Sequence, residues 1–210
     1  MPKANPKIDY SKPVMVSPSL EASSRISDQK IDPLVANTFK YIREKEGFSS
    51  TPYTDTKNKW TIGIGTLIGK GTEEDLRKSE FYGKQIDENT AAQIARRDLQ
   101  AKADLMRQPD QLGKVVDSFS PELQAKLLSG YYRGDISGSP KAKALLNARK
   151  FTQAANQFLD NDEYRAAKAS KSGVAKRMEE LAAAIRNEGK PKTQPTFTEM
   201  VDARISNEMP

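Results

Sequence analysis

Apolar residues recur at helical spacing through most of the middle of the chain. The first such stretch covers residues 32–46, where they lie three or four positions apart, which predicts an amphipathic helix. Asp32 is suited to cap the start of this helix and Pro33 to occupy its first turn. Gly47 ends the pattern. The apolar positions are Val35, Phe39 and Ile42.

The helical pattern is then interrupted by the segment TPYTDTKNKWTIGIGTLIG, residues 51–69. Its β-branched and aromatic residues, divided by the polar sequence Lys57-Asn58-Lys59, predict a β-hairpin. Residues 66–68 are expected to add a short third strand.

After Gly71 the pattern is helical again to about Asn187, with a polar capping residue at the start of most segments. The expected caps are Thr72, either Asp87 or Thr90, Ser120 and Ser139, and further helices are expected over 151–159 and 174–186. We therefore predict an α+β protein with one helix, a small antiparallel sheet and a helical lobe. A cleft between sheet and lobe is the expected ligand site.

The two ends of the chain differ from this body in composition. Residues 1–32 are rich in proline, serine and lysine, and we interpret them as an extended or disordered arm. Residues 188–210 are interpreted as a polar tail, which leaves residues 33–187 as a single folded domain. The chain has no apolar run long enough to span a membrane and no apolar signal segment near its start. We therefore expect synthesis in the cytoplasm without a signal peptide.

The chain has 210 residues, and the absence of both cysteine and histidine narrows its chemistry. These absences exclude disulfides, thiol nucleophiles, Ser-His-Asp triads and zinc sites built on imidazole or thiolate. Any acid–base chemistry near neutral pH must therefore use carboxylates, lysine, tyrosine or bound water. The net charge of +6 favours an anionic partner, but the charges alternate in sign along the chain. No pattern typical of a nucleic-acid binder accompanies them.

Two carboxylates near the predicted hairpin are candidates for such chemistry. Glu46 ends the first helix near its apolar face, where burial and the helix dipole favour a protonated carboxyl. Asp55 lies in a polar strand and is expected to stay ionised. Two carboxyls kept in different states are typical of glycoside hydrolysis.

Other residues of the hairpin fit the same chemistry. Simple pairing about Asn58 places Thr61 opposite Asp55, where its hydroxyl can help to hold a water. Gly65 lets a ligand approach the backbone closely, and Tyr53 offers a flat surface on which a sugar can stack. Each residue alone is more often structural, and only the combination favours a site.

The segment KEGFSSTPYTDTKNKWTIGIG resembles the active-site region of T-even bacteriophage lysozymes, glycoside hydrolase family 24. Members have Glu-Gly at a helix end, then Tyr-x-Asp, then Thr-x-Gly-x-Gly. The matching residues are Glu46, Gly47, Tyr53, Asp55, Thr61, Gly63 and Gly65, with nine and six residues between Glu, Asp and Thr. The resemblance covers about residues 33–187 and implies a lysozyme-like fold.

The resemblance also implies a reaction. Family members hydrolyse the β-1,4 bond between N-acetylmuramic acid and N-acetylglucosamine in peptidoglycan, without metal or cofactor. By the match, Glu46 is the general acid, and Asp55 and Thr61 position the attacking water, with inversion at the anomeric carbon. The implied substrate contacts are Leu67 after the glycines and Tyr131 and Gln157 in the helical lobe, beside Tyr53 and Gly65.

The chain departs from the family pattern outside the three catalytic positions. Thr66 replaces a frequent histidine, which suggests the loss of a contact between the lobes. Tyr131-Tyr132 replaces a Phe-amide pair, and a paired arginine is reduced to Lys176-Arg177.

The arm leaves the biological setting open. A phage origin is favoured, with action at the periplasmic cell wall after release at lysis or after carriage in the virion. The arm is either inert sequence or a tether to phage tail or internal virion proteins. The alternatives are a toxin domain with the same chemistry and a non-catalytic glycan-binding or virion structural protein on a lysozyme fold.

Overall fold

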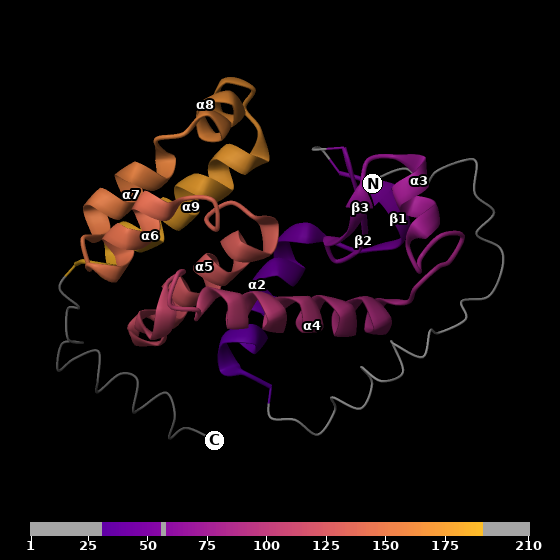
Figure 1. Cartoon of the computed structure of the whole chain (residues 1–210), viewed down its shortest axis with the longest axis horizontal. Helices are drawn as coiled ribbons and strands as arrows, with labels where there is room; N and C mark the ends of the chain where they lie inside the picture. The colour runs from indigo at the N-terminus through magenta and orange to yellow at the C-terminus, as the bar shows by residue number, and fades with distance from the viewer. Residues whose placement is uncertain (1–30, 56–57, 191–210) are drawn as a thin grey trace, which may run out of the picture.

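The computed structural model describes residues 31–55 and 58–190. The expected arm over 1–32 therefore lies almost wholly outside the described residues, as does most of the expected tail over 188–210. The described part has twelve elements, which begin with helix α2 and end with helix α9 (Figure 1).

Helix α2 spans Pro33–Glu46 and begins as the sequence predicts. The Asp32 side chain accepts a hydrogen bond from the backbone N–H of Leu34 at 2.9 Å, which satisfies one of the free donors at a helix start. Gly47 ends the helix with a φ of 69°, a left-handed conformation that glycine adopts without steric cost. Glu46 is therefore fixed as the last helical residue.

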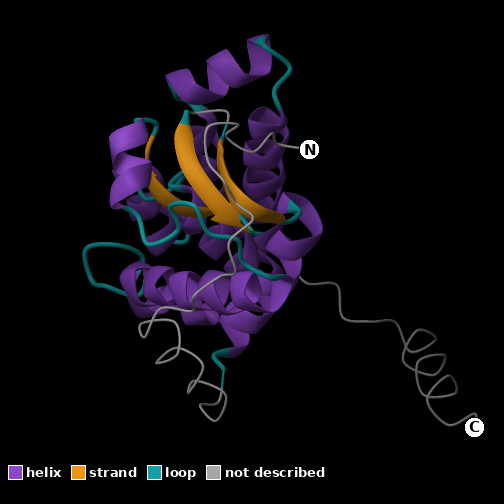
Figure 2. Ribbon diagram, turned by 90° about the vertical axis from the view of Figure 1, so that its right-hand side faces the viewer, coloured by secondary structure: helices purple, strands orange, loops and turns teal. Residues whose placement is uncertain are grey.

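The sheet follows directly and has three antiparallel strands in the order β1-β2-β3 (Figure 2). Strand β1 spans Ser49–Thr54, β2 spans Lys59–Gly63 and β3 spans Thr66–Lys70. The hairpin and the short third strand are thus confirmed. Ile62 of β2 belongs to the buried core that the sheet shares with the helices.

The rest of the described chain is helical. Its elements are α3 (Glu73–Lys78), α4 (Glu88–Met106), a short 3-10 helix η2 (Gly113–Ser118), α5 (Pro121–Arg133), α6 (Pro140–Asn147), α7 (Phe151–Leu159), α8 (Asp162–Ala169) and α9 (Gly173–Glu188). Thr72, Asp87 and Ser120 each cap their helix through the side chain, as expected, whereas the Ser139 side chain makes no capping hydrogen bond to α6. The α+β class is confirmed.

Helix α8 has no counterpart among the predicted elements. Its sequence, DEYRAAKA, contains no large aliphatic residue, and only Ala167 of the helix is buried. Its start is nevertheless local, because the Asn161 side chain accepts a hydrogen bond from the Tyr164 N–H at 2.8 Å.

Helix α4 joins the two parts of the molecule. It packs against β2 and β3 at one end and against α2 and α5 along its length (Figure 1). The approach to the sheet is close, since a Cβ added at Gly63 would lie 3.0 Å from the Cβ of Ala91. Buried residues of the sheet and of the helices therefore form one continuous core.

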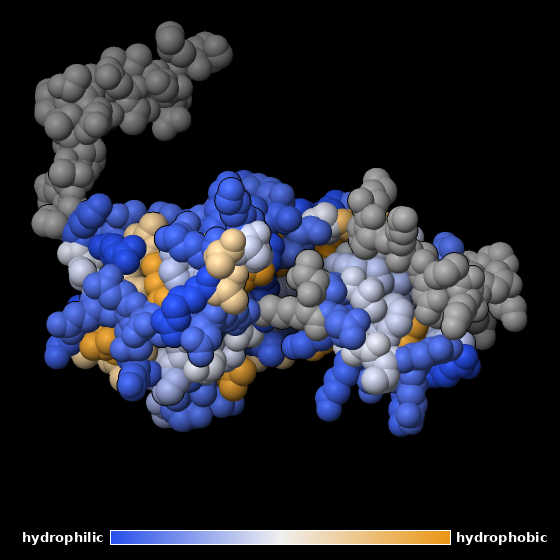
Figure 3. Space-filling view, turned by 90° about the horizontal axis from the view of Figure 1, so that it is seen from above, coloured by the Kyte–Doolittle hydropathy of each residue, from blue (hydrophilic) through white to orange (hydrophobic). Residues whose placement is uncertain are grey.

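The face of this body seen in Figure 3 is largely polar. Seen from above, hydrophilic residues dominate and apolar ones are scattered among them (Figure 3). Among the described residues, no helix is both long enough and apolar enough to cross a membrane.

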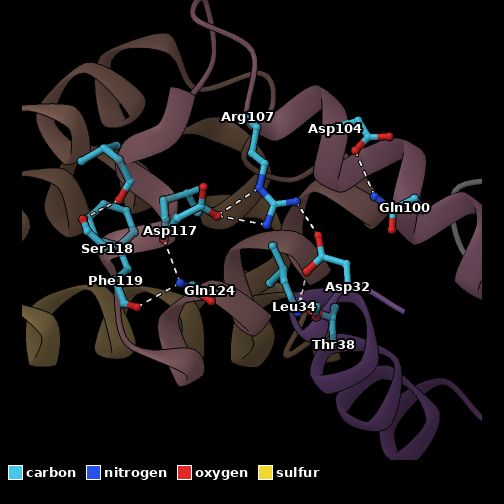
Figure 4. A network of polar contacts seen from close by, with 12 residues as sticks. Asp32, Leu34, Thr38, Gln100, Asp104, Arg107, Asp117, Ser118, Phe119 and Gln124 are labelled. Carbon is cyan, nitrogen blue, oxygen red and sulfur yellow. Dashed lines mark hydrogen bonds and ion pairs between the residues drawn. The ribbon is translucent and has the colours of Figure 1, made fainter. Parts of the chain in front are cut away.

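Arg107, which follows α4, ties the end of that helix to the start of α2 (Figure 4). Its Nη1 donates to Asp32 Oδ2 at 2.5 Å and its Nε donates to Asp117 Oδ1 at 3.0 Å. Burial alone would raise the pKa of Asp32. The hydrogen bonds from Arg107 and Leu34, with the charge of Arg107, instead hold the pKa of Asp32 below its ordinary value.

We expect Asp32→Asn to lower the free energy of unfolding by about 1 kcal/mol at neutral pH, because asparagine keeps the cap and loses the ion pair. A lowered carboxyl pKa stabilises the fold above the unfolded-state pKa of about 3.9, and this stabilisation is lost as pH falls through the folded-state value. The difference between wild type and variant should therefore shrink in acid. Urea unfolding at a series of pH values measures it, and a difference that persists in acid would contradict the assignment.

Candidate active site

A cleft of about 370 Å³ lies where the sheet meets the helical lobe. It is lined by Glu46, Tyr53, Thr54, Asp55, Lys59, Thr61, Gly65, Leu67, Tyr132, Arg133, Asp135, Val174 and Arg177. The three predicted catalytic residues are all in this set, although nine and six residues separate them along the chain.

Glu46 enters the cleft from the end of α2 with its side chain 20% exposed. Its Oε1 lies 3.8 Å from Nη1 of Arg133 and 3.9 Å from Nη1 of Arg177. This oxygen is buried and accepts no hydrogen bond from the described part of the chain. The other oxygen, Oε2, faces Gly65, where an added Cβ would lie 4.0 Å away. The two carboxylate oxygens thus have different surroundings, one cationic and one beside bare backbone.

The pairing of β1 with β2 differs from the expected register. Thr61 lies opposite Tyr53, and Thr54 lies opposite Trp60, so the prediction that Thr61 faces Asp55 directly is wrong. The loop closes earlier than symmetric pairing about Asn58 requires. Asp55 itself pairs with Lys59, through its N–H to the Lys59 carbonyl at 2.9 Å and its Oδ1 to the Lys59 N–H at 2.8 Å.

The shifted register still leaves Asp55 and Thr61 in one cleft. Side chains two residues apart on a strand share a face, so Asp55 lies on the face of Tyr53, and Tyr53 is paired with Thr61. Thr61 is only 5% exposed, and its hydroxyl donates weakly to the Lys59 carbonyl at 3.4 Å. Burial, with the nearby carboxylates of Glu46 and Asp55, raises the pKa of Tyr53. Its hydroxyl therefore remains a hydrogen-bond donor well into alkaline pH.

The helical lobe contributes Tyr132 to the cleft, in place of the Tyr131 expected from the family resemblance. Tyr131 is 1% exposed and its hydroxyl donates to Gln111 Oε1 at 3.2 Å, outside the cleft. Gln157, on α7, is also absent from the cleft lining. Leu67 does line it and is 59% exposed. Consecutive helix residues point in different directions, and the sequence alone does not show which tyrosine faces the sheet.

Thr66 and Tyr132 link the lobes at the position where the replacement of histidine by threonine suggested a lost contact. The Tyr132 hydroxyl donates to the Ile64 carbonyl at 3.0 Å and lies 3.3 Å from Thr66 Oγ1. Burial, aided by surrounding anions, strongly raises the pKa of Tyr132. Thr66 therefore makes a contact between the lobes through its own hydroxyl.

Three charged residues of the cleft were missed as site residues, namely Lys59, Arg133 and Asp135. Arg177 was expected only as part of Lys176-Arg177, the pair that stands in place of the family's paired arginines. Arg133 and Asp135 flank Gly134, which ends α5 with a φ of 82°. This helix-ending glycine is the one sequence signal that could have indicated a return of the chain toward the cleft.

The described residues contain no group of three or more acidic, histidine or cysteine side chains suited to a metal ion. The cleft side chains that can bind or move a proton are carboxylates, tyrosines, lysine and arginines. Such a set suits general acid–base chemistry.

A three-stranded sheet, a helical lobe and a carboxylate cleft between them define a lysozyme-like α+β protein. Residues 43–181, well over half of the chain, match the model of the family described as phage lysozyme. The chain therefore belongs to the phage lysozyme family, whose activity is hydrolysis of peptidoglycan. No curated protein matches the chain at a significant level.

We expect Tyr132→Phe to lower the free energy of unfolding by about 1 kcal/mol, because it removes the hydrogen bond between the lobes and leaves the Ile64 carbonyl without that donor. Tyr164→Phe is the matched control, since its hydroxyl bonds to Glu179 on the exposed surface. Chemical denaturation of both variants measures the effect. Equal decreases in the free energy of unfolding of the two variants would show that the contact between the lobes stabilises the fold no more than an exposed surface hydrogen bond does.

Proposed function

We propose that this protein is a muramidase, which cleaves the β-1,4 bond between N-acetylmuramic acid and N-acetylglucosamine. The observation that carries the proposal is that Glu46, Asp55 and Thr61 line one cleft although they come from three different elements or turns. Two carboxyls on either side of a bound sugar are what glycoside hydrolysis requires. Membership of the phage lysozyme family supports the same substrate.

In this proposal Glu46 is the general acid. It protonates the glycosidic oxygen as the bond to the leaving sugar breaks. The oxygen that faces Gly65 is the suitable donor, because that side of the carboxyl is next to backbone without a side chain. A sugar can therefore come close to the acid there.

Asp55 and Thr61 are proposed to position the attacking water, with inversion at the anomeric carbon. The hydrogen bond from the Lys59 N–H fixes the Asp55 carboxylate at the turn between β1 and β2. The Thr61 hydroxyl lies on the same face, and among the described residues its hydrogen bond is a long one, to the Lys59 carbonyl at 3.4 Å. It can therefore turn toward a water held by Asp55 at little cost.

Substrate contacts in this proposal come from the residues that line the cleft. Tyr53 presents its ring and a hydroxyl, Leu67 presents an exposed apolar side chain, and Gly65 leaves room for the sugar. Tyr132 takes the place first given to Tyr131 in the helical lobe.

The test is hydrolysis of purified peptidoglycan by wild type and by Glu46→Gln, followed by identification of the new reducing ends. Loss of the general acid should lower the rate by roughly 10²- to 10⁴-fold. Glu44→Gln is the matched control, because Glu44 lies on the same helix but is exposed, and it should keep wild-type activity.

Release of muramic-acid reducing ends by wild type, with loss in Glu46→Gln alone, would support the proposal. A folded wild type that binds the wall without cleaving it would overturn the proposal and favour the non-catalytic alternative. Equal activity of both variants would remove Glu46 from the chemistry.

We further propose that the enzyme acts at the periplasmic wall of a bacterial host and that residues 1–30 tether it to phage tail or internal virion proteins. The composition of this segment, rich in proline, serine and lysine, supports a tether, since such segments can order on a partner surface. A free lysis enzyme is the competing interpretation.

Deletion of residues 1–30 should leave hydrolysis of purified peptidoglycan within about twofold of the full chain, because the cleft lies wholly within the later residues. Incorporation into phage particles, measured by immunoblotting of purified virions, should be lost. A full chain that is absent from virions would contradict the tether, whereas a deleted chain that is still incorporated would place the tether elsewhere.

A further inference from the structure

After helix α5 the chain turns back toward the last turn of the helix, at the edge of the cleft. Arg133 is its last residue, and Gly134 follows in the left-handed conformation with a φ of 82°. The N–H of Asp135 then donates to the Gly130 carbonyl at 2.9 Å. This turn brings the side chain of Asp135 next to that of Arg133. Oδ2 of Asp135 accepts a hydrogen bond from Nε of Arg133 at 3.0 Å.

A second contact fixes the same guanidinium. Nη1 of Arg133 donates to Oγ of Ser129 at 2.9 Å, and Ser129 lies one turn earlier with 1% exposure. The side chain of Asp135 is itself only 5% exposed. Since a guanidinium is planar, two hydrogen bonds at different nitrogens set its orientation. The result is that Nη1 also lies 3.8 Å from Glu46 Oε1.

The second cation at Glu46 is not fixed in this way. Arg177, from α9, lies 3.9 Å from the same Oε1, but its buried Nε has no hydrogen-bond partner among residues 31–55 and 58–190. The charged or titratable side chains around Glu46 are Arg133 and Tyr132 from α5, Arg177 from α9, Tyr53 from β1, and Asp55, Lys59 and Asp135 in the cleft lining.

We propose that Asp135 is a positioning residue for the general acid and acts through Arg133. It holds the guanidinium so that its charge stabilises the carboxylate that Glu46 becomes when it gives up its proton. This inference rests on the proposed function. It assigns to the Arg-Gly-Asp sequence 133–135 a role in the chemistry in addition to ending a helix.

The sign of a pH effect separates positioning from simple charge. Asp135 is an anion, so its removal with Arg133 unmoved would favour ionisation of Glu46 and shift the alkaline limb of activity to lower pH. If Asp135 positions Arg133, its removal withdraws a cation from Glu46. The alkaline limb then moves to higher pH.

The experiment measures kcat and KM on soluble peptidoglycan oligosaccharides across pH, for the full chain and for Asp135→Asn. We expect kcat at the optimum to fall roughly 10- to 100-fold, the rate equivalent of one hydrogen bond to a charged group. KM should change by less than about twofold, and the alkaline limb should move to higher pH.

Asp117→Asn is the matched control. It removes a carboxylate that accepts from Nε of Arg107 at the same 3.0 Å, outside the cleft, and it should leave kcat unchanged. A third variant, Arg133→Met, removes the guanidinium through which Asp135 is proposed to act. If Asp135 acts only through Arg133, adding Asp135→Asn to Arg133→Met should cause no further loss of kcat. Thermal unfolding of each variant confirms that it is folded.

An unchanged kcat in Asp135→Asn, an alkaline limb at lower pH, or fully additive losses in the double variant would each overturn the inference. In all three cases an active wild type leaves the muramidase proposal in place. A wild type without activity would instead overturn the muramidase proposal and this inference together.

Discussion

The close packing of α4 against both the sheet and the helical lobe is the constraint on which the cleft depends. Gly63 meets Ala91 without room for another side chain, and the same helix packs along α2 and α5. Because α4 is shared, the end of α2 and the hairpin keep one relative position. Glu46 and Asp55 can therefore line the same cleft from different elements.

Local features of the sequence predicted the elements well, and long-range features escaped prediction. Asp32, Asp87 and Ser120 cap helices through contacts within three residues, which a sequence displays directly. The hairpin register depended on the backbone and side chain of Asp55 closing on Lys59, and symmetry about Asn58 misplaced it. The choice of Tyr132 over Tyr131 depended on how α5 packs against the sheet, which no local pattern encodes.

The surroundings of Glu46 show the same limit in electrostatic terms. The sequence placed this carboxyl at a helix end beside apolar residues, where burial and the dipole dominate. The fold adds two guanidinium groups from helices that begin about 75 and 127 residues later in the chain. An acid that must release a proton into a partly buried site thus has cations near one oxygen and the side-chain-free backbone of Gly65 near the other.

The hydrogen-bonded contact between Tyr132, Ile64 and Thr66 has a consequence for how the protein responds to pH. Its hydrogen bonds use hydroxyls and a backbone carbonyl, and the pKa of Tyr132 is raised by burial. These groups keep their protons throughout the range in which a histidine at the same place would gain or lose one. The hydrogen bonds of this contact therefore contain no imidazole-like proton, and the group beside them that responds to acid is the carboxyl of Asp98, which interacts with Thr66 and whose pKa is raised by burial.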